Sequence, residues 1–108
     1  MRLPNDTLIA PEKLAKYLLR WRPEDDKSAY LAQAGYTLEN SERLLADLQA
    51  QVMLNEIETT ENTEYGPKYT VRGVLRGPNG RELHIVTIWL AEEATGCTRF
   101  ITLFPDKT

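Results

Sequence analysis

The amino-acid sequence predicts an α+β fold in which two or three N-terminal helices pack on a three- to four-stranded antiparallel meander sheet. Apolar residues recur at helical spacing over about residues 10–51, and they alternate with polar residues over about residues 52–105. Helical segments followed by strands are typical of an α+β fold in which the helices cover one face of the sheet. The length of 108 residues, without a repeat or a linker, predicts a single domain over residues 1–108.

Three helical segments are expected in the first half of the chain. Pro11 suits the first turn of the first helix, and Pro23 ends that helix because proline cannot continue the backbone hydrogen-bond ladder. The second segment, "SAYLAQAG", ends at Gly35, a residue type that favours the conformation found after helix ends. The third segment is "ENSERLLADLQAQV". It carries an apolar stripe at helical spacing: Leu44, Leu45, Leu48 and Val52.

The second half of the chain has the pattern of strands. The segment "VMLNEIETTENTEYG" is ambiguous, because its first part extends the third helix and its Thr-rich tail is typical of an edge strand. The runs "KYTVRGVLR" and "RELHIVTIWL" flank the turn "GPNG" and predict a hairpin. After the loop "EEATG", the run "CTRFITLFP" predicts a last strand that stops at Pro105.

The loop "GPNG" decides which side chains share a face of the sheet. A two-residue loop would comprise Pro78 and Asn79, whereas a three-residue loop would add Gly80. Two-residue loops favour turns with a positive φ at the first corner, which proline cannot adopt. We therefore expect the three-residue loop, a type I turn followed by a left-handed glycine, which pairs Arg76 with Glu82.

This register divides the side chains of the hairpin between two faces. The more apolar set is expected to meet the helices: Tyr69, Val71, Gly73, Leu75, Leu83, Ile85, Thr87 and Trp89. The opposite face is expected to carry the other set: Lys68, Thr70, Arg72, Val74, Arg76, His84, Val86, Ile88 and Leu90. A slip of one residue would exchange the faces of the second strand, burying His84 and exposing Trp89.

Composition and charge exclude several classes of function. The net charge of -3 and a pI near 5.2 argue against strong non-specific binding to nucleic acid, which depends on cationic side chains. Cys97 is the only cysteine and His84 the only histidine, which excludes a thiolate zinc site and a two-histidine ribonuclease mechanism. We expect no metal and no cofactor. Without an apolar run of signal-peptide or membrane-spanning length, a cytoplasmic protein without membrane contact is expected.

A basic stripe is the first candidate site. Lys68, Arg72 and Arg76 share one face of a strand at four-residue spacing, which suits phosphate groups or an acidic partner surface. Long cationic side chains also commonly do no more than solvate an exposed sheet face, and the spacing does not separate these interpretations. His84 is the natural candidate for proton transfer near neutral pH. Alternation places Phe100, Thr102 and Phe104 on one face of the last strand, where Thr102 would reach His84 or Arg72 if the strands are neighbours.

Three aromatic residues form a second candidate group. Tyr65, Tyr69 and Trp89 would form either a shelf on which a base stacks or the packing of the sheet against the helices. The packing interpretation is favoured because it is the usual fate of large aromatic side chains.

Several motifs resemble a family of small uncharacterised bacterial domains, a domain of unknown function. The motifs are "A-x-x-KL-x-x-YLL", "YGPKY-x-V-x-G-x-L-x-GPNG", "V-x-T-x-W" and "T-x-FP", and the likeness runs from about Ile9 to Pro105. These residues carry it: Lys13, Leu14, Tyr17, Leu18, Tyr65, Gly66, Lys68, Tyr69, Gly73, Thr87, Trp89, Thr102 and Pro105.

The chain also resembles, more distantly, the colicin/RelE-type ribonuclease toxins, which place helices before an antiparallel sheet. That resemblance implies metal-independent RNA cleavage on the open sheet face. It implies phosphate binding by Lys68 and Arg72, proton transfer by His84 and positioning by Thr102.

Two hypotheses for function follow. In the first, the protein is a small metal-independent endoribonuclease, the toxin of a toxin–antitoxin pair, whose basic face binds RNA and is masked by an acidic antitoxin-like protein. In the second, it is a non-enzymatic interaction module or a homodimer. Four apolar residues on the face away from the helices motivate the second hypothesis: Val74, Val86, Ile88 and Leu90.

Overall fold

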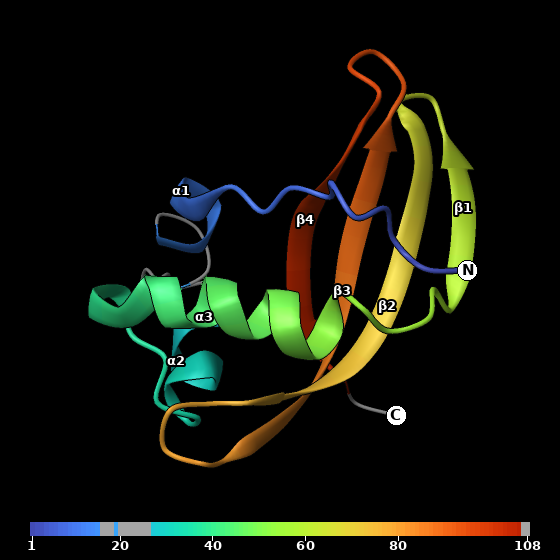
Figure 1. Cartoon of the computed structure of the whole chain (residues 1–108). Helices are drawn as coiled ribbons and strands as arrows, with labels where there is room; N and C mark the ends of the chain where they lie inside the picture. Colours follow the sequence, from blue (N-terminus) through green and yellow to red (C-terminus); the bar gives the residue numbers. More distant parts are fainter. Residues whose placement is uncertain (16–18, 20–26, 107–108) are drawn as a thin grey trace.

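A computed structural model of the chain describes residues 1–15, 19 and 27–106. The helices come first: α1 (Pro11–Lys13), α2 (Lys27–Ala32), the short 3₁₀ helix η2 (Leu38–Asn40), α3 (Ser41–Asp47) and the π-helical turn η3 (Leu48–Val52). The strands follow: β1 (Thr59–Thr63), β2 (Gly66–Arg76), β3 (Glu82–Glu92) and β4 (Cys97–Pro105). They form one antiparallel sheet in the order β1-β2-β3-β4, so the predicted α+β fold is confirmed (Figure 1). The predicted helix end at Pro23 lies outside the described residues.

The β2–β3 loop has the predicted three-residue form. Arg76 pairs with Glu82, and the N–H of Gly80 donates to the carbonyl oxygen of Gly77 at 3.0 Å. Gly80 has a φ of 85°, the left-handed conformation that the turn requires. The predicted register is therefore confirmed, with Trp89 fully buried and His84 exposed.

The core lies between one face of the sheet, here called the inner face, and the helices. α3 lies across this face, and the segment before α1 crosses it beside α3 (Figure 1). The apolar stripe of α3 and η3 faces this core, because its residues recur every three to four positions and so share one side of the helix. One buried cluster joins both layers: Leu44, Leu48 and Val52 from the helices, with Val71, Leu75, Ile85, Trp89 and Leu103 from the sheet.

The "GPNG" loop is attached to the end of α2. An added Cβ on Gly77 would lie only 2.0 Å from the carbonyl oxygen of Ala34, so only glycine allows this approach. Asn79 holds the contact, because its backbone N–H donates to Ala34 at 3.3 Å and its side-chain amide donates to Gln33 at 3.0 Å. The loop therefore joins the hairpin to the helical layer as well as turning the chain.

Two amide side chains cover the edge of β2 beyond Thr70, where β1 no longer pairs with it. Gln51 accepts a hydrogen bond from the backbone N–H of Arg76 at 2.7 Å and donates to its carbonyl oxygen at 3.1 Å. Asn55 donates to the carbonyl oxygen of Arg72 at 3.1 Å. The helix and the turn after it thereby supply hydrogen bonds that a neighbouring strand would otherwise make.

The last strand contains a bulge that corrects one prediction. The pairing with β3 shifts by one residue between Ile88 and Trp89, so Trp89 pairs with Phe100 and Ile88 pairs with Thr102. Ile101 is the extra residue. The prediction that Phe100 shares a face with Thr102 and Phe104 is therefore wrong. Phe100 lies in the core, with its ring packed edge-on against Trp89 at a centroid distance of 5.2 Å.

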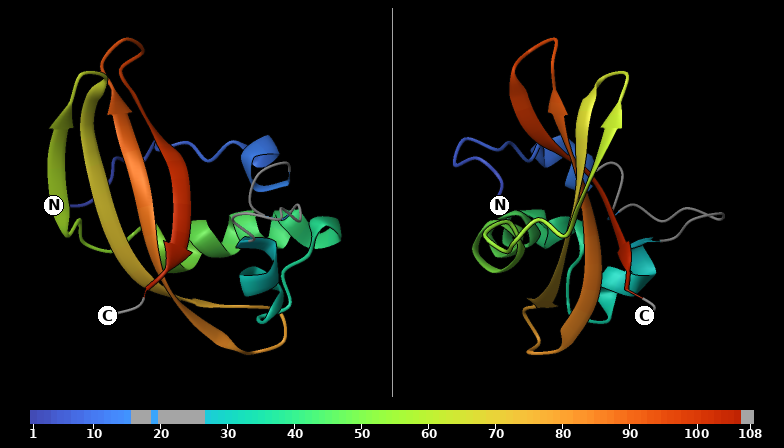
Figure 2. Two further views of the ribbon diagram at one scale, coloured as in Figure 1. Left: turned by 180° about the vertical axis from the view of Figure 1, so that it is seen from behind. Right: turned by 90° about the vertical axis from the view of Figure 1, so that its right-hand side faces the viewer.

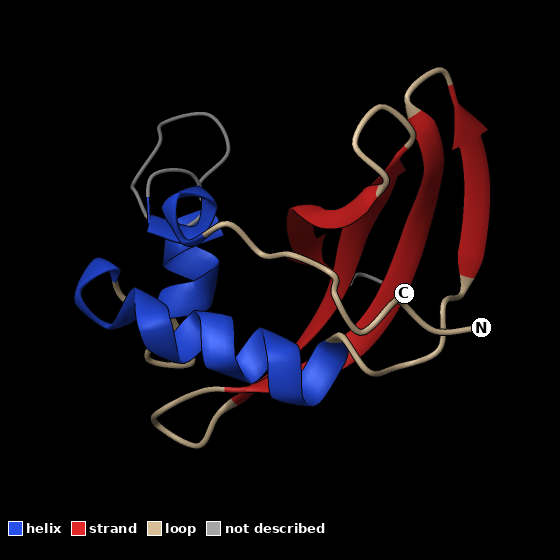
Figure 3. Ribbon diagram, turned by 45° about the horizontal axis from the view of Figure 1, so that its top comes forward, coloured by secondary structure: helices blue, strands red, loops and turns tan. Residues whose placement is uncertain are grey.

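The helices gather around the end of the sheet that carries the β2–β3 loop, whereas the β1–β2 and β3–β4 loops project away from them (Figure 3). α2 lies beside the end of β4 (Figure 2). The hydroxyl of Tyr30 in α2 donates to the carbonyl oxygen of His84 at 2.8 Å. The sheet face turned away from α3 is the surface on which the predicted basic stripe, His84 and Thr102 lie.

Candidate functional site

The sheet face turned away from α3, here called the outer face, holds the residues predicted for catalysis and phosphate binding. Strand pairing places three rows of side chains on it, because directly paired residues point to the same side of a sheet. The rows are Lys68–Leu90–Arg99, Thr70–Ile88–Thr102 and Arg72–Val86–Phe104, followed by the pair Val74–His84 nearer the β2–β3 loop.

Arg72 lies at the centre of this face and is held by two carboxylates. Its Nε lies 2.6 Å from the Glu58 carboxylate, and its Nη1 donates to Asp106 at 2.7 Å. Glu58 lies at the β1 side of β2, and Asp106 follows β4 on the other side of β3. The Arg72 side chain therefore links the chain beside β1 to the chain after β4.

This arrangement has two physical consequences. The hydrogen bonds with Asp106 and Glu58 raise the pKa of the Arg72 guanidinium, which remains a cation. To reach Asp106, the Arg72 side chain passes over β3 at Val86, the residue with which it is paired. Val86 is only 5% exposed although it lies on the outer face.

Other cations of the predicted stripe and its surroundings are also close to acidic residues. The Lys68 ammonium lies 3.1 Å from the Glu61 carboxylate, and Arg99 donates to Glu92 at 2.6 Å. Arg76 is exposed at the end of β2, directly across from Glu82. The stripe is thus interleaved with carboxylates on the neighbouring chain segments, a pattern that lowers its attraction for phosphate groups.

The structure brings His84 and Arg72 together but keeps Thr102 apart from His84. His84 pairs with Val74 and is a diagonal neighbour of Arg72, a relation in which Cα atoms lie about 7–8 Å apart. Thr102 pairs with Ile88, four residues along β3 from His84, which corresponds to roughly 13 Å along the strand. The Thr102 hydroxyl accepts a hydrogen bond from the Lys27 ammonium at 2.8 Å.

Sequence reasoning missed Asp106, Glu58 and Lys27 as members of the outer face. Asp106 contacts Arg72 and also donates its backbone N–H to the carbonyl oxygen of His84 at 2.9 Å. Its place across from His84 depends on the bulge in β4, which no alternation pattern reveals. A signal for Glu58 existed in the sequence, because an acidic residue just ahead of an edge strand is a natural partner for a cation on the next strand.

The predicted aromatic group is divided by the structure. Tyr69 and Trp89 are directly paired, and Tyr69 packs against the core. Tyr65 lies apart from them in the β1–β2 loop and is 63% exposed. The N–H of Glu93 donates to the carbonyl oxygen of Tyr65 at 3.0 Å, so the β1–β2 loop is hydrogen-bonded to the β3–β4 loop.

Apolar side chains complete the outer face. Val74 is 38% exposed and Phe104 is 39% exposed, while Ile88 and Leu90 between the charged rows are partly buried. Val74 and Phe104 flank the Arg72–Asp106 ion pair, since Phe104 shares a row with Arg72 and Val74 lies in the next row. The outer face is therefore apolar, with ion pairs between its apolar residues.

Two features are absent from residues 1–15, 19 and 27–106. Within these ranges no group of three or more His, Cys, Asp or Glu side chains is arranged to hold a metal ion. In the same ranges no helix is long and apolar enough to span a bilayer.

Comparison with known proteins identifies the family. Searches of curated proteins and of solved structures returned no match. The model of one protein family, described as Domain of unknown function (DUF6883), matches residues 2–107. This range covers nearly the whole chain and includes the outer face, the core and all four strands. The chain therefore belongs to the DUF6883 family of domains of unknown function.

Proposed function

We propose that the protein is a non-enzymatic interaction module that binds another protein through the outer face. One observation carries this proposal: exposed Val74 and Phe104 flank a central cation, Arg72, that is already paired with Glu58 and Asp106. Apolar side chains between internally neutralised ion pairs suit a protein surface, because the contact buries apolar area without leaving a charge unpaired.

A second copy of the same chain is the simplest partner. In a two-fold symmetric contact the same surface meets itself, so it must carry groups that complement one another. The outer face meets this condition, since the ion pairs of Arg72 with Glu58 and Asp106 place both signs of charge beside Val74 and Phe104.

Light scattering and sedimentation over a concentration series test this proposal. We expect the wild type to form a dimer and the variants Val74→Glu and Phe104→Glu to be monomers with unchanged circular dichroism. Leu54→Glu is the matched control, because Leu54 is also an exposed aliphatic residue but lies between η3 and β1. A wild type that stays monomeric throughout, or a dimer that both variants leave intact, would exclude self-association through this face.

The second candidate is a metal-independent ribonuclease of the toxin type. The specific observation in its favour is that exposed His84 is a diagonal neighbour of Arg72 on the outer face. In this candidate His84 transfers the proton, while Lys68, Arg72 and Arg76 hold phosphate groups. RNA would have to displace Asp106 and Glu58 from Arg72.

Induced expression and cleavage of single-stranded RNA by the purified protein test this candidate. Growth arrest and cleavage that disappear in His84→Ala and Arg72→Ala, but persist in the control Arg81→Ala, would favour the ribonuclease over the interaction module. Arg81 is an exposed arginine next to the β2–β3 loop and outside the rows of the outer face. Cleavage that all three variants retain would mean that the outer face is not the active site.

A further inference from the structure

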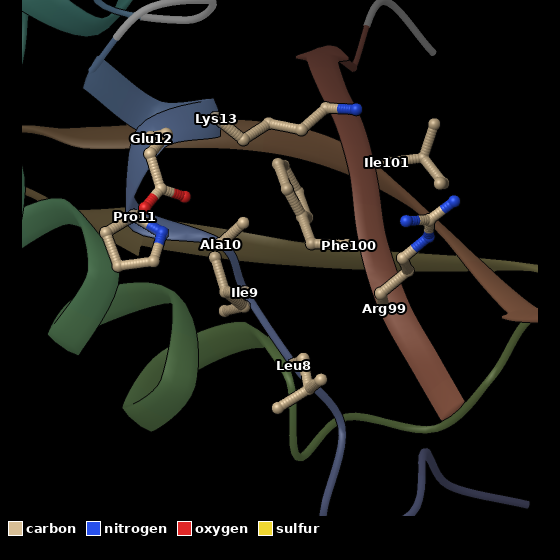
Figure 4. Close-up of a pocket in the computed structure, with 9 residues that line it drawn as sticks. All are labelled: Leu8, Ile9, Ala10, Pro11, Glu12, Lys13, Arg99, Phe100 and Ile101. Atoms are coloured by element: carbon tan, nitrogen blue, oxygen red, sulfur yellow. The ribbon is translucent and has the colours of Figure 1, made fainter. Parts of the chain in front are cut away.

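A pocket of about 440 Å³ lies between the N-terminal segment and β4 (Figure 4). A volume of this size falls within the range of roughly 300–1,000 Å³ that is typical of small-molecule sites. The lining is mostly apolar and comes from two stretches of chain that are far apart in the sequence: Leu8, Ile9, Ala10 and Pro11 on one side, Phe100 and Ile101 on the other. Three charged residues complete it: Glu12, Lys13 and Arg99.

The course of the backbone explains why a pocket forms at this point. The N–H of Leu8 donates to Thr98 at 2.9 Å and the N–H of Phe100 donates to Leu8 at 2.8 Å, which makes a single parallel bridge between the two stretches. Directly after this bridge the two stretches separate. The N-terminal segment turns into α1 at Pro11, which has no N–H with which to extend the pairing, and β4 bulges at Ile101. The pocket therefore depends on the backbone of both segments and not on the conformation of one side chain.

The pocket has a buried apolar base and an exposed apolar mouth. Ile9 and Phe100 are buried, whereas Leu8 is 55% exposed. A bound apolar group that covered Leu8 would remove this apolar surface from water, which favours binding. An apolar cavity of roughly 150 Å³ lined by Leu, Ile and Phe side chains holds one benzene molecule. The pocket beside β4 has walls of the same residue types and is large enough for two fused rings.

The charges around the pocket compensate one another. Arg99 is ion-paired with Glu92, to which its Nη2 donates at 2.6 Å. Lys13 also takes part in an interaction of its own and is not a free cation. Glu12 adds a second carboxylate, which lies beside Pro11 in Figure 4. Two cations and two carboxylates leave no net charge, so an ionic ligand would lose part of its hydration at an apolar wall without gaining an unpaired charge in return.

We propose that this pocket binds a small uncharged apolar molecule of about the size of two fused rings, independently of the function proposed for the outer face. The rings of the ligand lie against Ile9 and Phe100 at the base and cover Leu8 at the mouth. An uncharged polar substituent of the ligand, such as a hydroxyl, stays at the mouth in contact with water, where its hydration is kept. The selection of the ligand rests on its size and on the absence of charge.

Titration of the full chain with 2-naphthol, followed by amide NMR shifts and calorimetry, tests this inference. The probes 2-naphthoate and 2-naphthylmethylammonium carry the same two rings with a negative and a positive charge. We expect saturable shifts at residues 8–13 and 99–101 with 2-naphthol, and binding about ten-fold weaker for both ions. Phenol should also bind more weakly than 2-naphthol, because its single ring covers less apolar surface. The inference is overturned if either ion binds as tightly as 2-naphthol, or if the shifts scatter over the surface.

Three variants locate the binding. Leu8→Ser keeps the backbone bridge to β4 but removes the apolar mouth, and should weaken 2-naphthol binding about five-fold. Leu54→Ser is the matched control and should bind like the wild type, because Leu54 is a similarly exposed leucine, at 59%, outside the pocket.

Ala10→Trp fills the pocket from an exposed position and should abolish binding, which decides the matter even if Leu8→Ser fails to fold. The inference is wrong if folded Leu8→Ser binds as tightly as Leu54→Ser, or if Ala10→Trp binds like the wild type.

Discussion

Thr87 shows how a single residue of the "V-x-T-x-W" motif contributes to structure. It is fully buried on the inner face, where its hydroxyl accepts a hydrogen bond from the indole N–H of Trp89 at 2.7 Å. The same hydroxyl donates to the carbonyl oxygen of Val71 at 2.8 Å. The motif therefore satisfies the one polar group of a fully buried tryptophan, and its structural role is sufficient to explain both residues.

Replacing Thr87 by valine is expected to destabilise the protein by about 1–3 kcal/mol, because the shape is kept but the buried indole N–H loses its acceptor. Urea unfolding followed by tryptophan fluorescence measures the change. Thr87→Ser is the matched control: it retains the hydroxyl and loses one methyl group, which costs roughly 0.5–1.5 kcal/mol. If the valine variant is as stable as the serine variant, the hydrogen bonds of the Thr87 hydroxyl with Trp89 and Val71 do not contribute measurably to stability.

Gly66 determines how the element β2 begins. It has a φ of 130°, and an added Cβ would lie 2.1 Å from the carbonyl oxygen of Ala91. The Thr63 hydroxyl donates to the carbonyl oxygen of Gly66 at 2.7 Å, which closes the turn from β1. Pro67 follows in the strand, so the "YGPKY" segment sets the point from which side chains of β2 alternate, with Lys68 to the outer face and Tyr69 to the core.

Gly66→Ala and Gly96→Ala form a matched pair at the element scale. Gly96 also has a positive φ, 72°, but an added Cβ there would meet nothing within 4 Å. Gly96→Ala should cost about 1–2 kcal/mol from backbone strain alone. Gly66→Ala adds a steric clash and should cost roughly 2–5 kcal/mol. Chemical denaturation measures both, and equal losses would show that the close approach to Ala91 relaxes at little cost.

At the scale of the whole molecule, Tyr36 connects the helices to the sheet. Its hydroxyl donates to Asp47 in α3 at 2.6 Å and lies 3.1 Å from the carbonyl oxygen of Arg76 at the end of β2. Arg43 donates to the same carboxylate at 2.9 Å, so the largely buried Asp47 is satisfied from two directions. Burial, followed by the hydrogen bond to Asp47, raises the pKa of Tyr36.

The raised pKa of Tyr36 predicts a loss of stability in alkali. An unfolded tyrosine releases its proton above pH of about 10, whereas folded Tyr36 remains protonated, so the free energy of unfolding falls as pH rises beyond that value. Urea unfolding at increasing pH should show this fall in the wild type and a shallower one in Tyr36→Phe. Tyr65→Phe, at an exposed position, should behave like the wild type. Identical slopes in all three proteins would contradict the prediction.

The sequence alone determined the order of the elements, the register of the β2–β3 hairpin and the division of its side chains between two faces. These features depend on neighbours in the chain: helical spacing around Leu44 and Leu48, alternation along β2 and β3, and the geometry that Pro78 and Gly80 impose on one turn. The composition of the outer face, including the nearness of His84 to Arg72, was predictable for the same reason.

Only the tertiary structure decided what Arg72 does on that face. Its partners Glu58 and Asp106 come from opposite edges of the sheet, and Asp106 is brought across from His84 by one extra residue, Ile101, that leaves no trace in the pattern of β4. The parallel bridge between Leu8 and Arg99 likewise joins two positions about ninety residues apart in the chain. Local preferences set the course of each element, but contacts between distant segments depend on how all the layers pack together.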